Sequence, residues 1–210
     1  MLNWKLKRTL QTPAMFELID YRDTSDLNQI NSDAHSSDSS GWHRMGEAVA
    51  NVARRINATM EDGLDTLDLS DCKLIGFPDG VLKMIRSYAD KIHKITLANN
   101  SMKNLSGKFF TMFTELRELD LQGNTLTKLP DAIGEMQHLI SIDLSNNNFS
   151  VFPEQLTNVN TLQNINMSGN QISDVPWERV CAMSSLNVVD LRSNPLTSSP
   201  HTSQNFTLLT

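Results

Sequence analysis

Several features that would point to catalysis are missing from this sequence. Only two of the 210 residues are cysteine, and neither a Cys-x-x-Cys pair nor a Gly-rich phosphate-binding loop occurs. The five histidines show no spacing typical of metal ligands. The sequence therefore offers no cofactor site, no metal site and no catalytic residues, and we expect a protein that is not an enzyme.

Long apolar runs and a surplus of positive charge are also absent. No stretch approaches the roughly 18 apolar residues that a membrane span needs, and the start of the chain lacks the apolar core of a signal peptide. The formal net charge is −6, which disfavours nucleic acid and anionic lipid as partners. Two free thiols fit a reducing compartment. We therefore expect a cytoplasmic, monomeric protein without membrane or nucleic-acid binding.

What the sequence does contain is one apolar spacing that occurs six times. The stretch 116–130, LRELDLQGNTLTKLP, has apolar residues at its first, fourth and sixth positions and Asn at its ninth. The second and third of these apolar residues lie on one face of a strand, and the residues between them on the other. Six copies predict a solenoid whose repeats are stable only when stacked. The copies begin at Leu64, Ile92, Leu116, Leu139, Leu162 and Leu186.

The ninth position of each copy marks the turn that follows the predicted strand. An Asn amide there can satisfy backbone groups that the bend leaves unpaired, so stacked repeats would form a ladder. Pro follows six places later in five copies, and Ser106 takes that place in the other. Cys181 lies in the fifth return, about 19 Å from the first ladder position and too far for a disulfide. The ladder positions are Cys72, Asn100, Asn124, Asn147, Asn170 and Asn194.

Composition divides the chain into four segments. Residues 1–42 form a disordered extension with an acidic, Ser-rich linker, although residues 1–12 also fit an amphipathic membrane anchor or a transit segment. Residues 43–62 carry apolar side chains at three- and four-residue steps, which predicts a capping helix or, alternatively, a partner-binding helix. Residues 63–200 hold the six repeats. The tail 201–210 is too short and polar for a good cap, which suggests a shortened or alternatively spliced product, unless its apolar residues fold over the last strand.

The repeats resemble those of the leucine-rich-repeat family. The stretches MGEAVANVARRINATMEDGLDTLDLSDCKL, LRELDLQGNTLTKLP and LRSNPL resemble a small intracellular vertebrate member over about residues 44–196, which leaves out residues 1–42 and the tail after 197. The resemblance implies an α/β solenoid with a curved parallel sheet of about six strands. It also implies short helical or irregular segments on the convex side and an N-terminal capping helix. The resemblance further implies that the protein is intracellular and has no enzymatic activity.

The outward strand positions predict a concave binding face. They hold six acidic and two basic side chains, hence a charge of −4, so we predict that this face receives a basic segment of a protein partner. Against this, Leu-Asp-Leu is common in such repeats, and the face has no aromatic anchor. The predicted partner-binding residues are Asp68, Thr96, Glu118, Asp120, Asp143, Asn166, Asp190 and Arg192.

The most direct functional interpretation is an adaptor or scaffold. Two alternatives stay open: a regulatory subunit of a phosphatase or other signalling enzyme, and a peripheral membrane protein that uses residues 1–12. On the convex side, Trp177 is either an exposed anchor or part of the packing. The three phenylalanines at 109, 110 and 113 are predicted to belong to the core.

Overall fold

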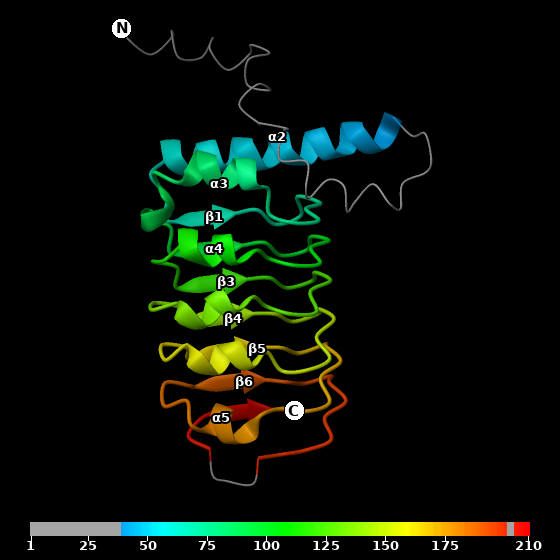
Figure 1. Ribbon diagram of the computed structural model, residues 1–210, viewed down its shortest axis with the longest axis vertical. Helices are drawn as coiled ribbons and strands as arrows, with labels where there is room; N and C mark the ends of the chain where they lie inside the picture. Colours follow the sequence, from blue (N-terminus) through cyan, green and yellow to red (C-terminus); the bar gives the residue numbers. More distant parts are fainter. Residues whose placement is uncertain (1–38, 201–203) are drawn as a thin grey trace, which may run out of the picture. The chain divides into compact units, whose positions relative to one another are not determined.

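The computed structural model describes residues 39–200 and 204–210. The chain divides into two compact units, residues 1–45 and 46–210, and the fold below is that of the second unit. Its centre is one parallel sheet whose seven strands follow in chain order, visible as successive rungs in Figure 1. The strands are β1 (Thr66–Asp68), β2 (Lys94–Thr96), β3 (Glu118–Asp120), β4 (Ser141–Asp143), β5 (Asn164–Asn166), β6 (Val188–Asp190) and β7 (Thr207–Leu209).

The apolar spacing of the repeats sets the register of this sheet. Leu119 pairs with Ile95 on one side and Ile142 on the other, and Ile142 pairs in turn with Ile165. Each of these side chains points into the core, where its exposed fraction is at most 2%. The predicted α/β solenoid of parallel rungs is therefore confirmed, with seven strands in the described chain instead of about six.

Short helices cover the convex side of the repeats. Four of them begin directly after the repeated proline, because a fixed φ and a missing N–H suit the position before the first turn. Ser106, which interrupts the proline series, caps the helix Gly107–Met112 by accepting the Lys108 N–H at 3.2 Å. The helical segments are α3 (Asp79–Ile85), η3 (Ala89–Lys91), α4 (Gly107–Met112), η4 (Asp131–Glu135), η5 (Glu154–Asn158) and α5 (Trp177–Cys181).

Helix α2 (Ser39–Glu61) precedes β1 and begins four residues before the predicted start at residue 43. Within the second unit, Val52 and Ile56 of this helix are fully buried in the core. Gly63 ends the helix in the left-handed region at φ 68°, and the Leu64 N–H donates to the Thr59 carbonyl at 3.0 Å, as in a Schellman motif. The Leu64 side chain, at the first position of the first repeat, belongs to this helix-ending turn and is 49% exposed.

Aromatic residues fill the wide convex half of the second repeat. Phe109, Phe110 and Phe113 are buried, and the first and last of these rings lie 4.9 Å apart between centroids. Phe77 from the preceding repeat packs edge-on against Phe109 at 5.2 Å. Trp177 is only 8% exposed, and its Nε1 donates to the Ser198 hydroxyl, so the interpretation of this residue as an exposed anchor is wrong.

The C-terminal residues form a strand, which agrees with the alternative that the apolar residues of the tail fold over the last strand. Thr207–Leu209 pair in parallel with β6, and the Leu191 N–H donates to the Leu209 carbonyl at 2.7 Å. Phe206, 8% exposed, joins the hydrophobic core, and Leu208 packs against it. The residues after the sixth repeat thus add a short seventh rung.

Candidate protein-binding surface

A ladder of buried asparagines holds the ends of the strands together. Asn147 is typical: its Nδ2 donates to the carbonyls of Leu121 and Leu144 at 3.0 and 3.1 Å, and its Oδ1 accepts the Leu126 N–H at 2.9 Å. One side chain therefore ties its own turn to the preceding repeat. The same pattern of bonds occurs at Asn100, Asn124, Asn170 and Asn194.

The first ladder position carries a thiol in place of an amide. The Cys72 Sγ accepts a hydrogen bond from the Asn51 Nδ2 of α2 at 3.6 Å, so the capping helix supplies the polar contact at this end. Burial raises the pKa of the Cys72 thiol, which keeps it neutral near pH 7. The next amide, Asn100, donates to the Leu69 carbonyl and so completes the first turn.

The residue before each ladder position has a left-handed backbone. Its φ lies between 54° and 68° in all six repeats, a region that favours Gly and, to a lesser degree, Asn and Asp. These residues form the outer row of the concave side. They are Asp71, Asn99, Gly123, Asn146, Gly169 and Ser193.

The last residue of each strand from β1 to β6 forms a central column on the concave face. Every side chain in this column accepts the backbone N–H two residues further on, which caps the end of its own strand. In β4, for example, the Asp143 Oδ1 accepts from both the backbone N–H and the hydroxyl of Ser145, at 2.8 and 2.6 Å. The capping pairs are Asp68–Ser70, Thr96–Ala98, Asp120–Gln122, Asp143–Ser145, Asn166–Ser168 and Asp190–Arg192.

Half of the acidic side chains on this face have a basic partner. Glu118 pairs with Lys94 at 2.8 Å, and the hydrogen bond and charge of Glu118 raise the pKa of Lys94. Asp190 pairs with Arg192 at 2.6 Å, a contact that lowers the pKa of Asp190. The third pair joins Asp68 to Arg55 of α2 at 3.4 Å. The predicted charge of −4 already includes Lys94 and Arg192, so Arg55 is the one additional positive charge that the structure brings to these carboxylates.

Asp120 and Asp143 stand apart from these pairs. They are register neighbours on β3 and β4, and within the described chain no basic side chain forms a salt bridge with either. The second oxygen of each accepts a neutral donor: the Thr96 hydroxyl at 3.1 Å for Asp120 and the Asn166 amide at 2.8 Å for Asp143. Together with Asp71 of the outer row, these are the acidic side chains of the face that have no salt bridge within the described chain.

A shallow depression of about 220 Å³ lies beside this pair, over β4, β5 and β6. Ser141, Asn164 and Val188 line it next to the central-column residues of the same strands. Its size falls below the ~300–1,000 Å³ of typical small-molecule sites. Asp190 lies at its edge but is only 7% exposed, so this predicted binding residue offers little surface to a partner.

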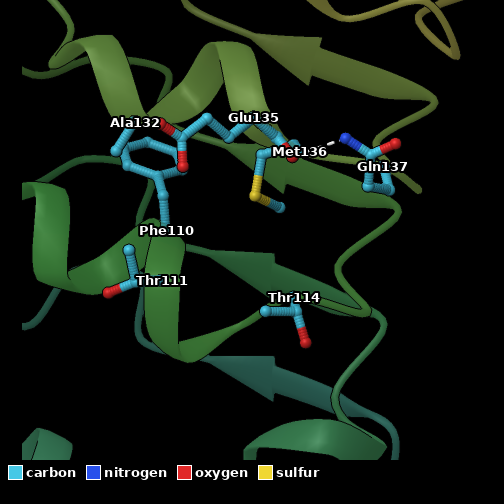
Figure 2. A pocket seen from close by; sticks show the side chains of 7 residues that line it. All are labelled: Phe110, Thr111, Thr114, Ala132, Glu135, Met136 and Gln137. Carbon is cyan, nitrogen blue, oxygen red and sulfur yellow. Dashed lines mark hydrogen bonds between the residues drawn. The ribbon is translucent and has the colours of Figure 1, made fainter.

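A second hollow, of about 200 Å³, lies on the convex side between α4 and η4. Figure 2 shows Phe110 and Thr111 on one side of it and Ala132, Glu135 and Met136 on the other. The Gln137 Nε2 donates to the Glu135 carbonyl at 2.9 Å. The walls are mainly apolar and Glu135 is the one ionisable side chain among them, so the hollow lacks the groups that acid–base chemistry needs.

Comparison with known proteins places this geometry in a family. A leucine rich repeat family model matches residues 90–149 and 114–172. Leucine-rich repeat-containing protein 20 of Mus musculus is 63% identical over 153 residues, which are 73% of this chain and 83% of that protein. The chain is a leucine-rich-repeat protein. The resemblance stated from the motifs is therefore confirmed.

Two further leucine-rich-repeat proteins extend the comparison. The Homo sapiens protein of the same name is 55% identical over 96 residues, 46% of this chain and 52% of that protein. A solved structure of a Leptospira interrogans leucine-rich-repeat protein aligns with a TM-score of 0.57 and 26% identity, over 68% of this chain and 34% of that one. Members of the family typically bind other proteins and are generally not enzymes.

The structure is also informative about the other predicted sites. Among the described residues, no group of three or more His, Cys, Asp or Glu side chains could hold a metal ion, and no helix is long and apolar enough to cross a membrane. The proposed anchor at residues 1–12 lies outside the described residues. The strand-end caps and the left-handed outer row were not predicted, although Asp-x-Ser in two repeats and Gly or Asn before the ladder residue were their visible signals.

Proposed function

We propose that this leucine-rich-repeat protein is a non-catalytic adaptor or scaffold in the cytoplasm that binds a protein partner through its concave face. The observation that carries the proposal is the pair Asp120 and Asp143, whose charges have no basic partner on the described part of the face. Arg or Lys side chains of a partner would complete these carboxylates from the solvent side. The neighbouring depression over β4 to β6 offers room for the side chains that flank them.

The central-column caps also determine how much of the face is available. At Asp120 and Asp143 the cap uses one carboxylate oxygen for the backbone. The other oxygen accepts the Thr96 hydroxyl or the Asn166 amide, so a partner can add a hydrogen bond mainly at that second oxygen. Exposed ion pairs each contribute about 0–1 kcal/mol, so two of them give specificity and a faster encounter more than tight binding. We therefore expect a reversible interaction in which shape complementarity over several rungs supplies most of the affinity.

Site-specific photo-crosslinking tests the proposed surface. A photoreactive amino acid at Gln122, exposed beside β3 on the concave side, should give a discrete crosslinked partner in cells. The same amino acid at Glu135, exposed on the convex side, is the control and should not give that product. If crosslinking at Glu135 captured the same partner as efficiently as crosslinking at Gln122, the concave face would not be the binding surface.

A further inference from the structure

A second surface of this protein has the opposite charge to the concave face. It is formed by the segments that leave the ladder positions in the first four repeats, residues 73–76, 101–104, 125–128 and 148–151, which we name the lysine flank. Of their side chains, Lys73, Lys103 and Lys128 are basic and exposed, and none is acidic. The flank thus carries three positive charges on a protein whose net charge is −6.

Backbone hydrogen bonds hold these four segments in a fixed stack. The Ser101 N–H donates to the Leu74 carbonyl at 2.8 Å, the Thr125 N–H to Met102 at 3.0 Å, and the Asn148 N–H to Leu126 at 2.9 Å. Each bond runs from the first residue after one ladder position to the second residue after the preceding one, so equivalent positions of the four segments lie in rows across the rungs. Lys73, Lys103 and Lys128 stand one, three and four residues after their ladder positions. The flank is therefore a surface of defined geometry and not a set of independent loops.

Two exposed apolar side chains lie at the ends of this stack, with Lys103 and Lys128 in the repeats between them. Val151 is 60% exposed in the fourth repeat and Ile75 is 50% exposed in the first, which makes them the two most exposed large apolar side chains of the described chain. At about 4.8 Å per rung they lie roughly 14 Å apart along the stack.

The lysines of the flank have no acidic partner on the described chain that would neutralise them. Every salt bridge found in this part of the chain lies elsewhere, on the concave face or on the convex segments. Two acidic residues adjoin the flank. Asp71 precedes Lys73 by two residues, and Asp174 occupies in the fifth repeat the position that Val151 has in the fourth.

From this arrangement we infer that the lysine flank is a second docking surface, which binds an extended acidic segment of a protein partner carrying an apolar residue at each end. An extended chain advances about 3.3 Å per residue, so four or five residues cover the ~14 Å between Ile75 and Val151. The acidic concave face would repel such a segment and favour its encounter with the flank. The inference does not depend on the function proposed for the concave face.

The charge count favours a peptide over larger polyanions. Binding through an anionic membrane surface generally uses clusters of about four to eight basic residues. Specific DNA binding involves about six to ten phosphate contacts. Three lysines within about 14 Å fall short of both. They suit two or three carboxylates on one short segment.

Fluorescence anisotropy with the full chain tests the inference. The probe is a labelled pentapeptide with leucine at both ends and three acidic residues between, and binding is expected to weaken as salt is added. The double variant Lys103→Glu plus Lys128→Glu should bind about tenfold more weakly, because two exposed ion pairs become repulsive. Lys103→Gln plus Lys128→Gln should show a smaller loss, and Val151→Ser about a threefold loss with unchanged salt dependence.

A matched control separates the surface from net charge. Lys83→Glu plus Arg86→Glu makes the same change in charge on exposed residues at and beside α3, and should leave peptide binding within about twofold of the unmodified chain. Equal losses in the two charge-reversed variants would overturn the inference, as would absence of peptide binding at low ionic strength. Lysine-dependent sedimentation with phosphatidylserine vesicles, without lysine-dependent peptide binding, would assign the flank to a membrane and also overturn it.

Discussion

Replacing one central ladder residue, Asn147→Ala, should destabilise this protein more than any surface substitution. Asn147 is 4% exposed, and its loss leaves the buried Leu126 N–H without a partner. It also removes one of the two amide donors to each of the Leu121 and Leu144 carbonyls, which keep their bonds from Asn124 and Asn170. An unsatisfied buried N–H costs about 1–3 kcal/mol, and each lost carbonyl contact adds about 0.5–1.5 kcal/mol. We therefore expect the free energy of unfolding to fall by about 2–6 kcal/mol, a large share of the ~5–15 kcal/mol typical of a domain.

Position along the ladder gives this prediction a sharper form. Asn194 makes equivalent bonds but is partly exposed near the C-terminal end, so water can replace some of them. Asn194→Ala should lower the free energy of unfolding by only about 1–2 kcal/mol. The exposed neighbour Asn148, whose side chain makes no hydrogen bond within the described chain, is the control, and Asn148→Ala should change stability by less than about 0.5 kcal/mol.

Urea denaturation followed by circular dichroism measures all three variants, and the slope of the transition shows whether unfolding stays cooperative. The reasoning fails if Asn147→Ala costs less than about 1 kcal/mol. It also fails if Asn194→Ala costs as much as Asn147→Ala, because burial would then not decide the contribution of the ladder.

Three further predictions concern two residues of the outer row and the ion pair between Asp190 and Arg192 at the end of β6. Gly169→Ala should destabilise the protein by more than about 2 kcal/mol in urea melts, because φ is 68° and the added Cβ would lie 2.5 Å from the Asn146 Oδ1. Ser193→Gly, at φ 58°, should instead stabilise it by about 0.5–1 kcal/mol, and a lower urea midpoint would contradict this. The lowered pKa of Asp190 contributes stability that is fully present above about pH 4 and is lost as pH falls through that lowered pKa. Arg192→Gln should therefore destabilise the protein at pH 7 and do so progressively less as pH falls below about 4, and an effect that does not decrease with acid would contradict the assignment.

Much of the fold was predictable because the repeat imposes its own register. The spacing of Leu119 and its equivalents determines which side chains enter the core, and a slip of one residue would expose all of them. The buried phenylalanines and the helix before β1 followed from the same apolar periodicity. The family resemblance, now supported by 63% identity to a relative, added little to what the spacing already implied about the fold.

The seventh strand was less accessible to sequence reasoning. Pairing of β7 with β6 aligns Leu208 with Val189, the fourth position of the sixth repeat. In the repeat pattern, the first and sixth positions would then be apolar residues at 205 and 210, where the chain has Asn and Thr. Only Leu208 fits the template, and Phe206 fills the core from a position outside it. A single match in a polar tail gives no periodicity to detect.

On the concave face, the sequence did not reveal which acidic side chains have a basic partner. The residues of this face could be assigned to columns, but the number of uncompensated charges depends on contacts made by side chains distant in sequence. Arg55 of α2 reaches Asp68, and Lys94 reaches Glu118 on the neighbouring strand, at 3.4 and 2.8 Å. Counting charges treated these acids as equivalent to Asp120, whereas the structure separates them.

The most direct measurement of the central claim is the affinity of the crosslinked partner for a charge-reversed concave face. Asp120→Lys plus Asp143→Lys should weaken binding by at least about tenfold, as measured by titration calorimetry with the purified partner. Glu135→Lys plus Glu178→Lys makes the same change in charge on exposed convex residues and should leave the affinity within about twofold. Unchanged affinity of the concave variant, or an equal loss in both variants, would contradict binding through the concave face.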